Sequence, residues 1–142
     1  MFFPKKIVHN GMDRILRIIS PEVKDAMSDL MDTGFSFYAV DQRRGICYYN
    51  DRVITIPMFV LKHPDRKNYV NWYVSHECAH AFNFIHSMGK PDGHGPAFMA
   101  ELKKICPPAS LHFETGYKPR NAKAAGISNI PFFNTGVIPS DF

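Results

Sequence analysis

The 142-residue chain is long enough for one ordinary domain, with little left for a second. Its balance of 45% hydrophobic, 13% aromatic and 21% charged residues argues against collagen, coiled coil and intrinsic disorder. The net charge of +4 is compatible with a polyanionic partner but is too small to imply one.

The three cysteines are an odd number and include no C-x-x-C pair. A disulfide framework and a four-cysteine zinc ribbon are therefore excluded within this chain, and free thiols in a reducing cytosol are the simplest interpretation. Lys5 and Lys6 lie where a signal peptide would need its apolar stretch. Because no run approaches the roughly 18 apolar residues of a membrane span, we expect a cytoplasmic protein with no membrane partner.

The first part of the chain is typical of helices. Residues 13–19 have a helical pattern. The sequence Ser20-Pro21-Glu22 then provides an N-cap, a proline at the first helical position and an acid in the first turn. The apolar residues that follow recur at three- and four-residue spacing, and Gly34 is predicted to end this second helix.

Three short β-prone segments come next, at residues 35–40, 46–49 and 53–56. Turn residues separate them, and two hairpin-like connections predict a small antiparallel sheet. Pro57 follows the last segment. Because proline cannot donate a backbone hydrogen bond, we expect that strand at the edge of the sheet.

The rest of the chain is predicted to form two helices and an irregular segment. Residues 66–85 carry an apolar stripe at helical spacing, and the Gly- and Pro-rich residues 88–95 form a loop. Pro96 can begin the last helix, which two consecutive prolines close. We expect residues 1–108 to form the domain. The arm at residues 109–142 is expected to pack on that domain through three aromatic side chains, Phe132, Phe133 and Phe142.

The long predicted helix contains a complete H-E-x-x-H motif, His76-Glu77-Cys78-Ala79-His80. Four residues of α-helix advance about 400°, so His76 and His80 face the same way and can share one metal ion. Neutral imidazole suits Zn²⁺, and an open position on the metal would lower the pKa of its water towards about 7. Glu77 could then act as general base in the attack on a carbonyl, whereas Cys78 points elsewhere and is expected to be buried packing. The alternative is a chance pair of surface histidines flanking a glutamate.

A zinc site needs a third protein ligand, and three later residues offer one. His94 lies between two glycines in the loop that enters the last helix. His86 gives a metzincin-like spacing, but on a continuous helix it would point away from the metal. Glu101 on the last helix offers a carboxylate. The residues favour His94 and leave His86 and Glu101 open. Gly95 is expected to matter because a side chain there would crowd the approach to the zinc.

The paired motifs, H-E-C-A-H at residues 76–80 and G-H-G-P-A-F at residues 93–98, resemble the SprT-like (Spartan-type) zinc metalloprotease domain. A preceding helix, a short sheet and a strand ending in T-I-P extend the resemblance over about residues 12–106. The zinc ribbon that often follows this domain has no counterpart here, since Cys106 is the only cysteine after the motif.

The resemblance implies an α+β, minimal zincin-like fold with N-terminal helices, an active-site helix and a supporting C-terminal helix. It implies one Zn²⁺ per chain, held by His76, His80 and His94, with Glu77 as the catalytic base. It also implies proteolysis of proteins, which in the best-known members are bound or crosslinked to DNA.

Two functions from different classes follow as expectations. The first is a zinc endopeptidase whose protein or peptide substrate lies extended beside the strand at residues 53–56. The second is a non-catalytic, zinc-containing module that binds a protein or a nucleic acid. A small basic cluster in the arm, Lys118, Arg120 and Lys123, is a candidate DNA contact, with a solvated loop as the alternative.

Overall fold

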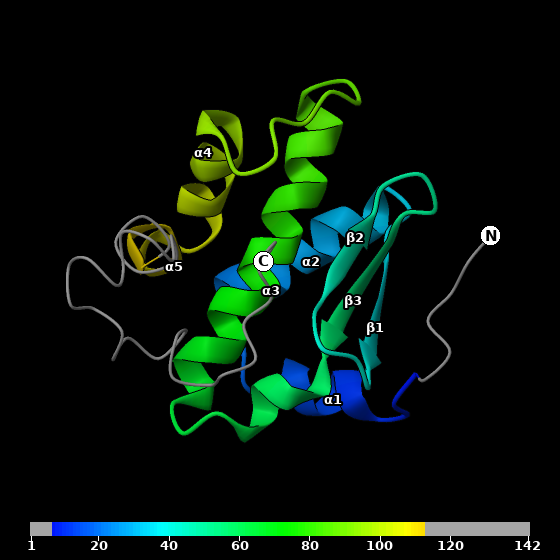
Figure 1. Cartoon of the computed structure of the whole chain (residues 1–142), viewed down its shortest axis with the longest axis vertical. Coiled ribbons are helices and arrows are strands. Elements are labelled where there is room, and N and C mark those ends of the chain that lie inside the picture. Colours follow the sequence, from blue (N-terminus) through cyan, green and yellow to red (C-terminus); the bar gives the residue numbers. More distant parts are fainter. Residues whose placement is uncertain (1–6, 113–142) are drawn as a thin grey trace.

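The computed structural model describes residues 7–112, which form an α+β fold, as the sequence predicts. The elements are α1 (Gly11–Leu16), α2 (Pro21–Asp32), β1 (Ser36–Val40), β2 (Ile46–Tyr48), β3 (Val53–Pro57), a 3-10 helix η1 (Met58–Lys62), α3 (Arg66–His86), α4 (Pro96–Ile105) and α5 (Pro107–His112). Figure 1 shows α3 crossing the centre of the fold, with the sheet on one side and α4 and α5 on the other. Because both sides pack on α3, this helix is the scaffold of the domain.

The two N-terminal helices form, and the second has the predicted signals at both ends. The side chain of Ser20 accepts a hydrogen bond from the backbone N–H of Val23 at 3.4 Å, and Pro21 occupies the first helical position. Gly34 follows the helix with a φ of +97°, which a glycine adopts without strain. The first helix ends at Leu16 instead of residue 19, because residues 17–19 form a turn that leads to the extended cap residue Ser20.

The sheet is mixed, whereas the sequence predicted antiparallel pairing throughout. Strand β2 pairs antiparallel with β3, as expected for a hairpin, but β1 pairs parallel with β3. The strand order β1-β3-β2 places β3 in the centre, so the prediction of an edge position for residues 53–56 is wrong. All five residues of β3 are buried. Pro57 belongs to the last residue pair between β1 and β3, so its missing N–H donor interrupts few of the hydrogen bonds between the strands.

The core fills the space between the sheet and the helices α2, α3 and α4. Its largest fully buried side chains include Tyr69 and Tyr73 of α3 and Phe98 of α4. The hydroxyl of Tyr73 accepts a hydrogen bond from the backbone N–H of Gly45 at 2.8 Å. This bond joins the turn before β2 directly to α3, and it fixes the edge strand beside the helix.

The described part of the chain ends in the helix α5. This helix runs across residue 108, where the sequence predicted the domain to end and an irregular arm to begin. The expected packing of the arm through Phe132, Phe133 and Phe142 lies outside the described residues, as does the basic cluster Lys118, Arg120 and Lys123. Within residues 7–112, every helix is too short or too polar to cross a membrane.

Candidate metal centre

The H-E-x-x-H motif lies in the second half of α3, which runs unbroken from Arg66 to His86. Regular helix geometry therefore brings His76 and His80 onto one face, and their Nε2 atoms are 3.2 Å apart. His76 is only 2% exposed, and His80 is partly exposed. The pair thus forms the floor of a site that opens to solvent on the side of His80.

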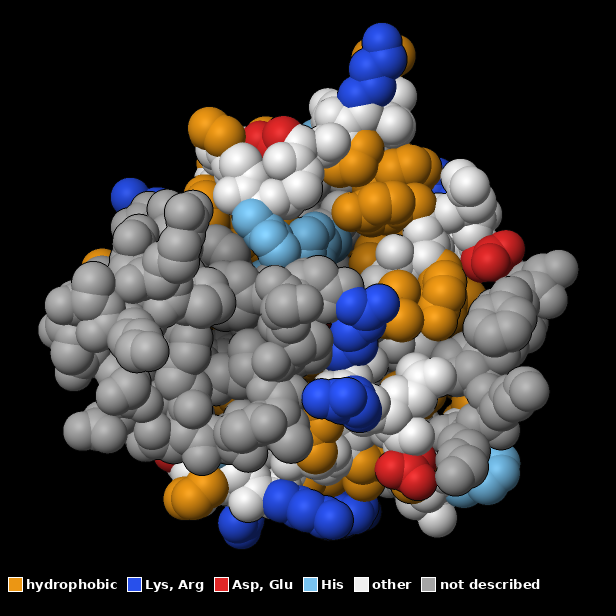
Figure 2. Space-filling model, in the orientation of Figure 1, with side chains coloured by type: hydrophobic (Ala, Val, Ile, Leu, Met, Phe, Trp, Pro, Cys, Tyr) orange, Lys and Arg blue, Asp and Glu red, His pale blue; other side chains and the backbone are white. Residues whose placement is uncertain are grey.

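His94 reaches the same point from the loop between α3 and α4. Its Nε2 atom is 3.3 Å from that of His76 and 3.2 Å from that of His80. Gly93 has a φ of +67°, a left-handed conformation that turns the chain back towards α3 just before this histidine. Figure 2 shows histidine side chains gathered at the surface in the upper half of this face, beside apolar side chains.

The three nitrogen atoms have the spacing that a tetrahedral metal requires. Zinc–nitrogen bonds of about 2.05 Å at tetrahedral angles place two ligand nitrogens about 3.3 Å apart. The observed separations of 3.2–3.3 Å therefore fit one ion held by three imidazoles. Three protein ligands leave the fourth position of a tetrahedral zinc open, which is typical of catalytic sites and not of structural ones.

The protonation of the histidines also suits a cation. Burial lowers the pKa of His76 well below its usual value, and the neighbouring histidines add to this effect. Burial and His94 lower the pKa of His80 to about 3, and burial lowers that of His94. All three rings are therefore neutral at pH 7, which is the form that binds metals.

Glu77 directly follows His76 on α3 and is buried, with an exposure of 3%. Burial raises its pKa to about 8, while the charge of Arg44 acts in the opposite direction. Its charge raises the pKa of Cys47 in β2 and of Tyr49 just after it, in each case adding to the effect of burial. The charge of Glu77 is thus felt by residues in and just after β2, the edge strand that contacts α3. A cation held by the histidines would favour its ionised form.

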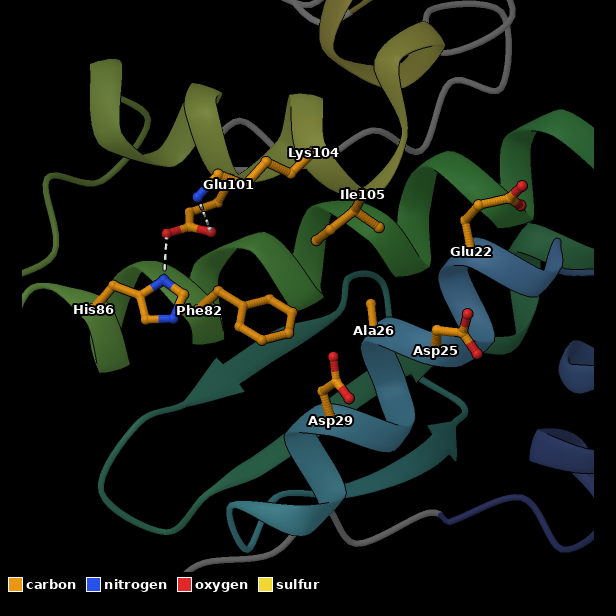
Figure 3. Close-up of a pocket in the computed structure, with 9 residues that line it drawn as sticks. All are labelled: Glu22, Asp25, Ala26, Asp29, Phe82, His86, Glu101, Lys104 and Ile105. Carbon is orange, nitrogen blue, oxygen red and sulfur yellow. Dashed lines mark hydrogen bonds and ion pairs between the residues drawn. The ribbon is translucent and has the colours of Figure 1, made fainter.

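The other two candidate ligands are paired with each other, away from this group. His86 Nδ1 and Glu101 Oε2 are 2.6 Å apart, and Lys104 lies 3.8 Å from the other oxygen of Glu101. These side chains help to line a cavity of about 250 Å³. Figure 3 shows them with the other lining residues, which come from α2, α3 and α4. The structure therefore brings His94 to His76 and His80 and leaves His86 and Glu101 elsewhere. That the three histidines bind metal stays a prediction.

Two details of the site were missed by the sequence interpretation. A Cβ atom on Gly95 would lie 2.6 Å from Asp92 Oδ2, so this glycine makes room for Asp92. That a side chain at Gly95 would also crowd the zinc stays a prediction. Asp92 itself and Asn83, which contact each other, were not identified. The only signal was an acid shortly before the proline that begins α4. Cys78 is buried in the core, as predicted.

The nitrogen Nδ1 of His80 is buried and has no hydrogen-bond partner within residues 7–112. A buried nitrogen without a partner costs free energy, and a metal-ligating histidine usually donates this second ring N–H to a partner.

Comparisons with known proteins agree with this geometry. The model of the SprT-like family matches residues 17–117, which is well over half of the chain. A search of curated proteins and a search of solved structures each gave no significant match. The matched residues include the whole of α3, α4 and the loop that carries His94. The chain therefore belongs to the SprT-like family, which indicates a metalloprotease-type domain.

Proposed function

We propose that the protein is a zinc-dependent endopeptidase that binds one Zn²⁺ through His76, His80 and His94. The observation that carries this proposal is the triangle of Nε2 atoms, 3.2–3.3 Å on each side, together with the buried carboxyl of Glu77, the residue after His76. The membership of the SprT-like family supports it independently of the distances.

Zinc at this position would supply Lewis acidity, which polarises a peptide carbonyl and lowers the pKa of water. Glu77 takes the proton of the attacking water and passes it to the leaving amine, as general base and then general acid. This role requires the ionised carboxylate at the start of the reaction. Arg44 favours that form through its charge, against the opposing effect of burial.

The substrate is proposed to pair with β2, because the structure places β3 in the centre of the sheet and β2 at its edge. The edge strand of a sheet offers unpaired backbone groups to an extended peptide without requiring particular side chains. The bond between Gly45 and Tyr73 fixes the start of β2 against α3, so a peptide paired there runs past the helix that carries Glu77. Proteins associated with DNA are the substrate class that the family resemblance implies.

The variant Glu77→Gln separates this function from that of a non-catalytic binding module. We expect the purified wild-type protein to carry about one zinc per chain and to cleave unfolded protein substrates. Glu77→Gln keeps the shape of the side chain and the three histidines, so it should retain the zinc and lose cleavage by at least about a hundredfold. Adding single-stranded DNA to the wild-type assay tests the DNA-linked substrate class. Wild-type protein that binds no zinc, or an equally active variant, would contradict the proposal.

A further inference from the structure

The carboxylate of Asp92 joins three parts of the chain around the site. Its Oδ1 atom accepts hydrogen bonds from the side-chain amide of Asn83 at 2.8 Å and from the backbone N–H of Phe98 at 3.1 Å. Its Oδ2 atom accepts one from the backbone N–H of Ala97 at 2.8 Å. The first of these donors belongs to α3, and the other two are in the first turn of α4. One side chain therefore ties the loop between these helices to both of them.

The residues joined by this carboxylate lie close in sequence to the three histidines. Asn83 follows His80 by three residues on α3, and Asp92 precedes His94 by two. Asn83 is buried, with an exposure of 1%, so its amide has a fixed position on the helix. The bond between Asn83 and Asp92 thus spans the gap between the part of the site on α3 and the part on the loop.

The loop around Asp92 is closely packed on its carboxylate. The backbone N–H of Gly95 donates to the carbonyl of Asp92 at 3.1 Å, so His94 lies within a turn closed by these two residues. A Cβ atom on Gly95 would lie 2.6 Å from Oδ2 and 2.9 Å from Cγ of Asp92. By contrast, a Cβ atom on Gly93 would meet nothing within 4 Å. The backbone at Gly95 is therefore packed against the carboxylate of Asp92, whereas the backbone at Gly93 is not crowded.

We propose that Asp92, held by Asn83, is a positioning residue of the metal centre that sets the place of His94 and so the affinity for zinc. This inference rests on the proposed function, because it concerns the same three histidines. Asp92 holds His94 over the pair on α3 before the metal arrives, so less ordering of the loop is needed on binding. Residues that orient ligands in this way typically change metal affinity by about 10–100-fold when they are replaced.

The test uses the full chain, Zn²⁺ alone as ligand, and competition with a chelating indicator to measure Kd. Asp92→Ala removes all three acceptor contacts, and Asn83→Ala removes only the link to α3. Asp92→Asn keeps the size of the side chain and one acceptor oxygen, so it provides a folded variant if Asp92→Ala is unstable. The control is Ser20→Ala, which removes the N-terminal cap of α2 far along the chain from the site.

We expect Asp92→Ala to raise the Kd for zinc by about 10–100-fold and Asn83→Ala by about tenfold, with Asp92→Asn between wild type and Asp92→Ala. Ser20→Ala should lower the melting temperature of the metal-free protein and leave the Kd unchanged. The visible spectrum of the Co²⁺-loaded protein, which reports ligand geometry, should change in Asp92→Ala and not in Ser20→Ala. A wild-type Kd and Co²⁺ spectrum in the Asp92 and Asn83 variants would overturn this inference while leaving the proposed function intact. Wild-type protein without affinity for zinc would overturn both.

Discussion

Gly45 is a position where one added methyl group should disturb the fold directly. A Cβ atom there would lie 2.5 Å from the backbone oxygen of Thr55, 2.9 Å from the ring of Tyr73 and 3.3 Å from Cδ of Pro57. The nearest of these atoms belongs to the central strand β3, which is buried and cannot move away easily. Gly45→Ala must therefore push the turn before β2 away from both the sheet and α3.

The free-energy cost of Gly45→Ala has two parts. Forcing a methyl group into packed surroundings costs about 1–3 kcal/mol. Weakening the hydrogen bond from the Gly45 N–H to the Tyr73 hydroxyl, now 2.8 Å long, adds about 1 kcal/mol. A total of about 2–4 kcal/mol corresponds to a fall in melting temperature of about 10 °C for a domain of this size.

The assay is thermal and urea unfolding followed by circular dichroism, with Gly34→Ala as the matched control. Gly34 has a φ of +97°, yet a Cβ atom there meets only Arg52 Cδ, at 3.6 Å. Gly34→Ala thus carries backbone strain without crowding, at about 1–2 kcal/mol, whereas Gly45→Ala carries crowding without a positive φ. The reasoning is refuted if Gly45→Ala unfolds at a higher temperature than Gly34→Ala, or at the same temperature as wild type.

Three further predictions concern the same helix and its site. His94→Ala should weaken zinc binding at least about tenfold, since it removes one of three ligands, while His86→Ala should leave the Kd unchanged. Competition titration measures both values, and the reverse result would point to a different third ligand. Tyr73→Phe should lower the free energy of unfolding by about 1–2 kcal/mol, because the N–H of Gly45 loses its acceptor, and a urea midpoint equal to wild type would contradict this. Removing the metal with a chelator should lower the melting temperature, and added Zn²⁺ should restore it, because a ligand that binds only the native state stabilises that state. A melting temperature that does not change with zinc would argue against the site.

Local patterns in the sequence predicted α2, α3 and α4 and the part of the candidate site that lies on α3. Ser20 and Gly34 mark the ends of α2 because caps act over three or four residues, which sequence shows directly. The spacing of His76 and His80 places both rings on one face of any regular helix, whatever the rest of the fold does. For these features, neighbours in the chain are neighbours in space.

Tertiary structure decided the features that depend on distant segments. Residues 53–56 became the central strand because β1 pairs beside them in parallel, although Pro57 favoured an edge. The sequence alone left three candidates for the third ligand, because it does not show where a Gly-rich loop lies relative to a helix before it. The hydrogen bonds of Asp92 with Asn83 and the first turn of α4 accompany the placement of His94 over His76 and His80. Those bonds join residues 5 to 9 positions apart across a turn, and no helical or strand period predicts them.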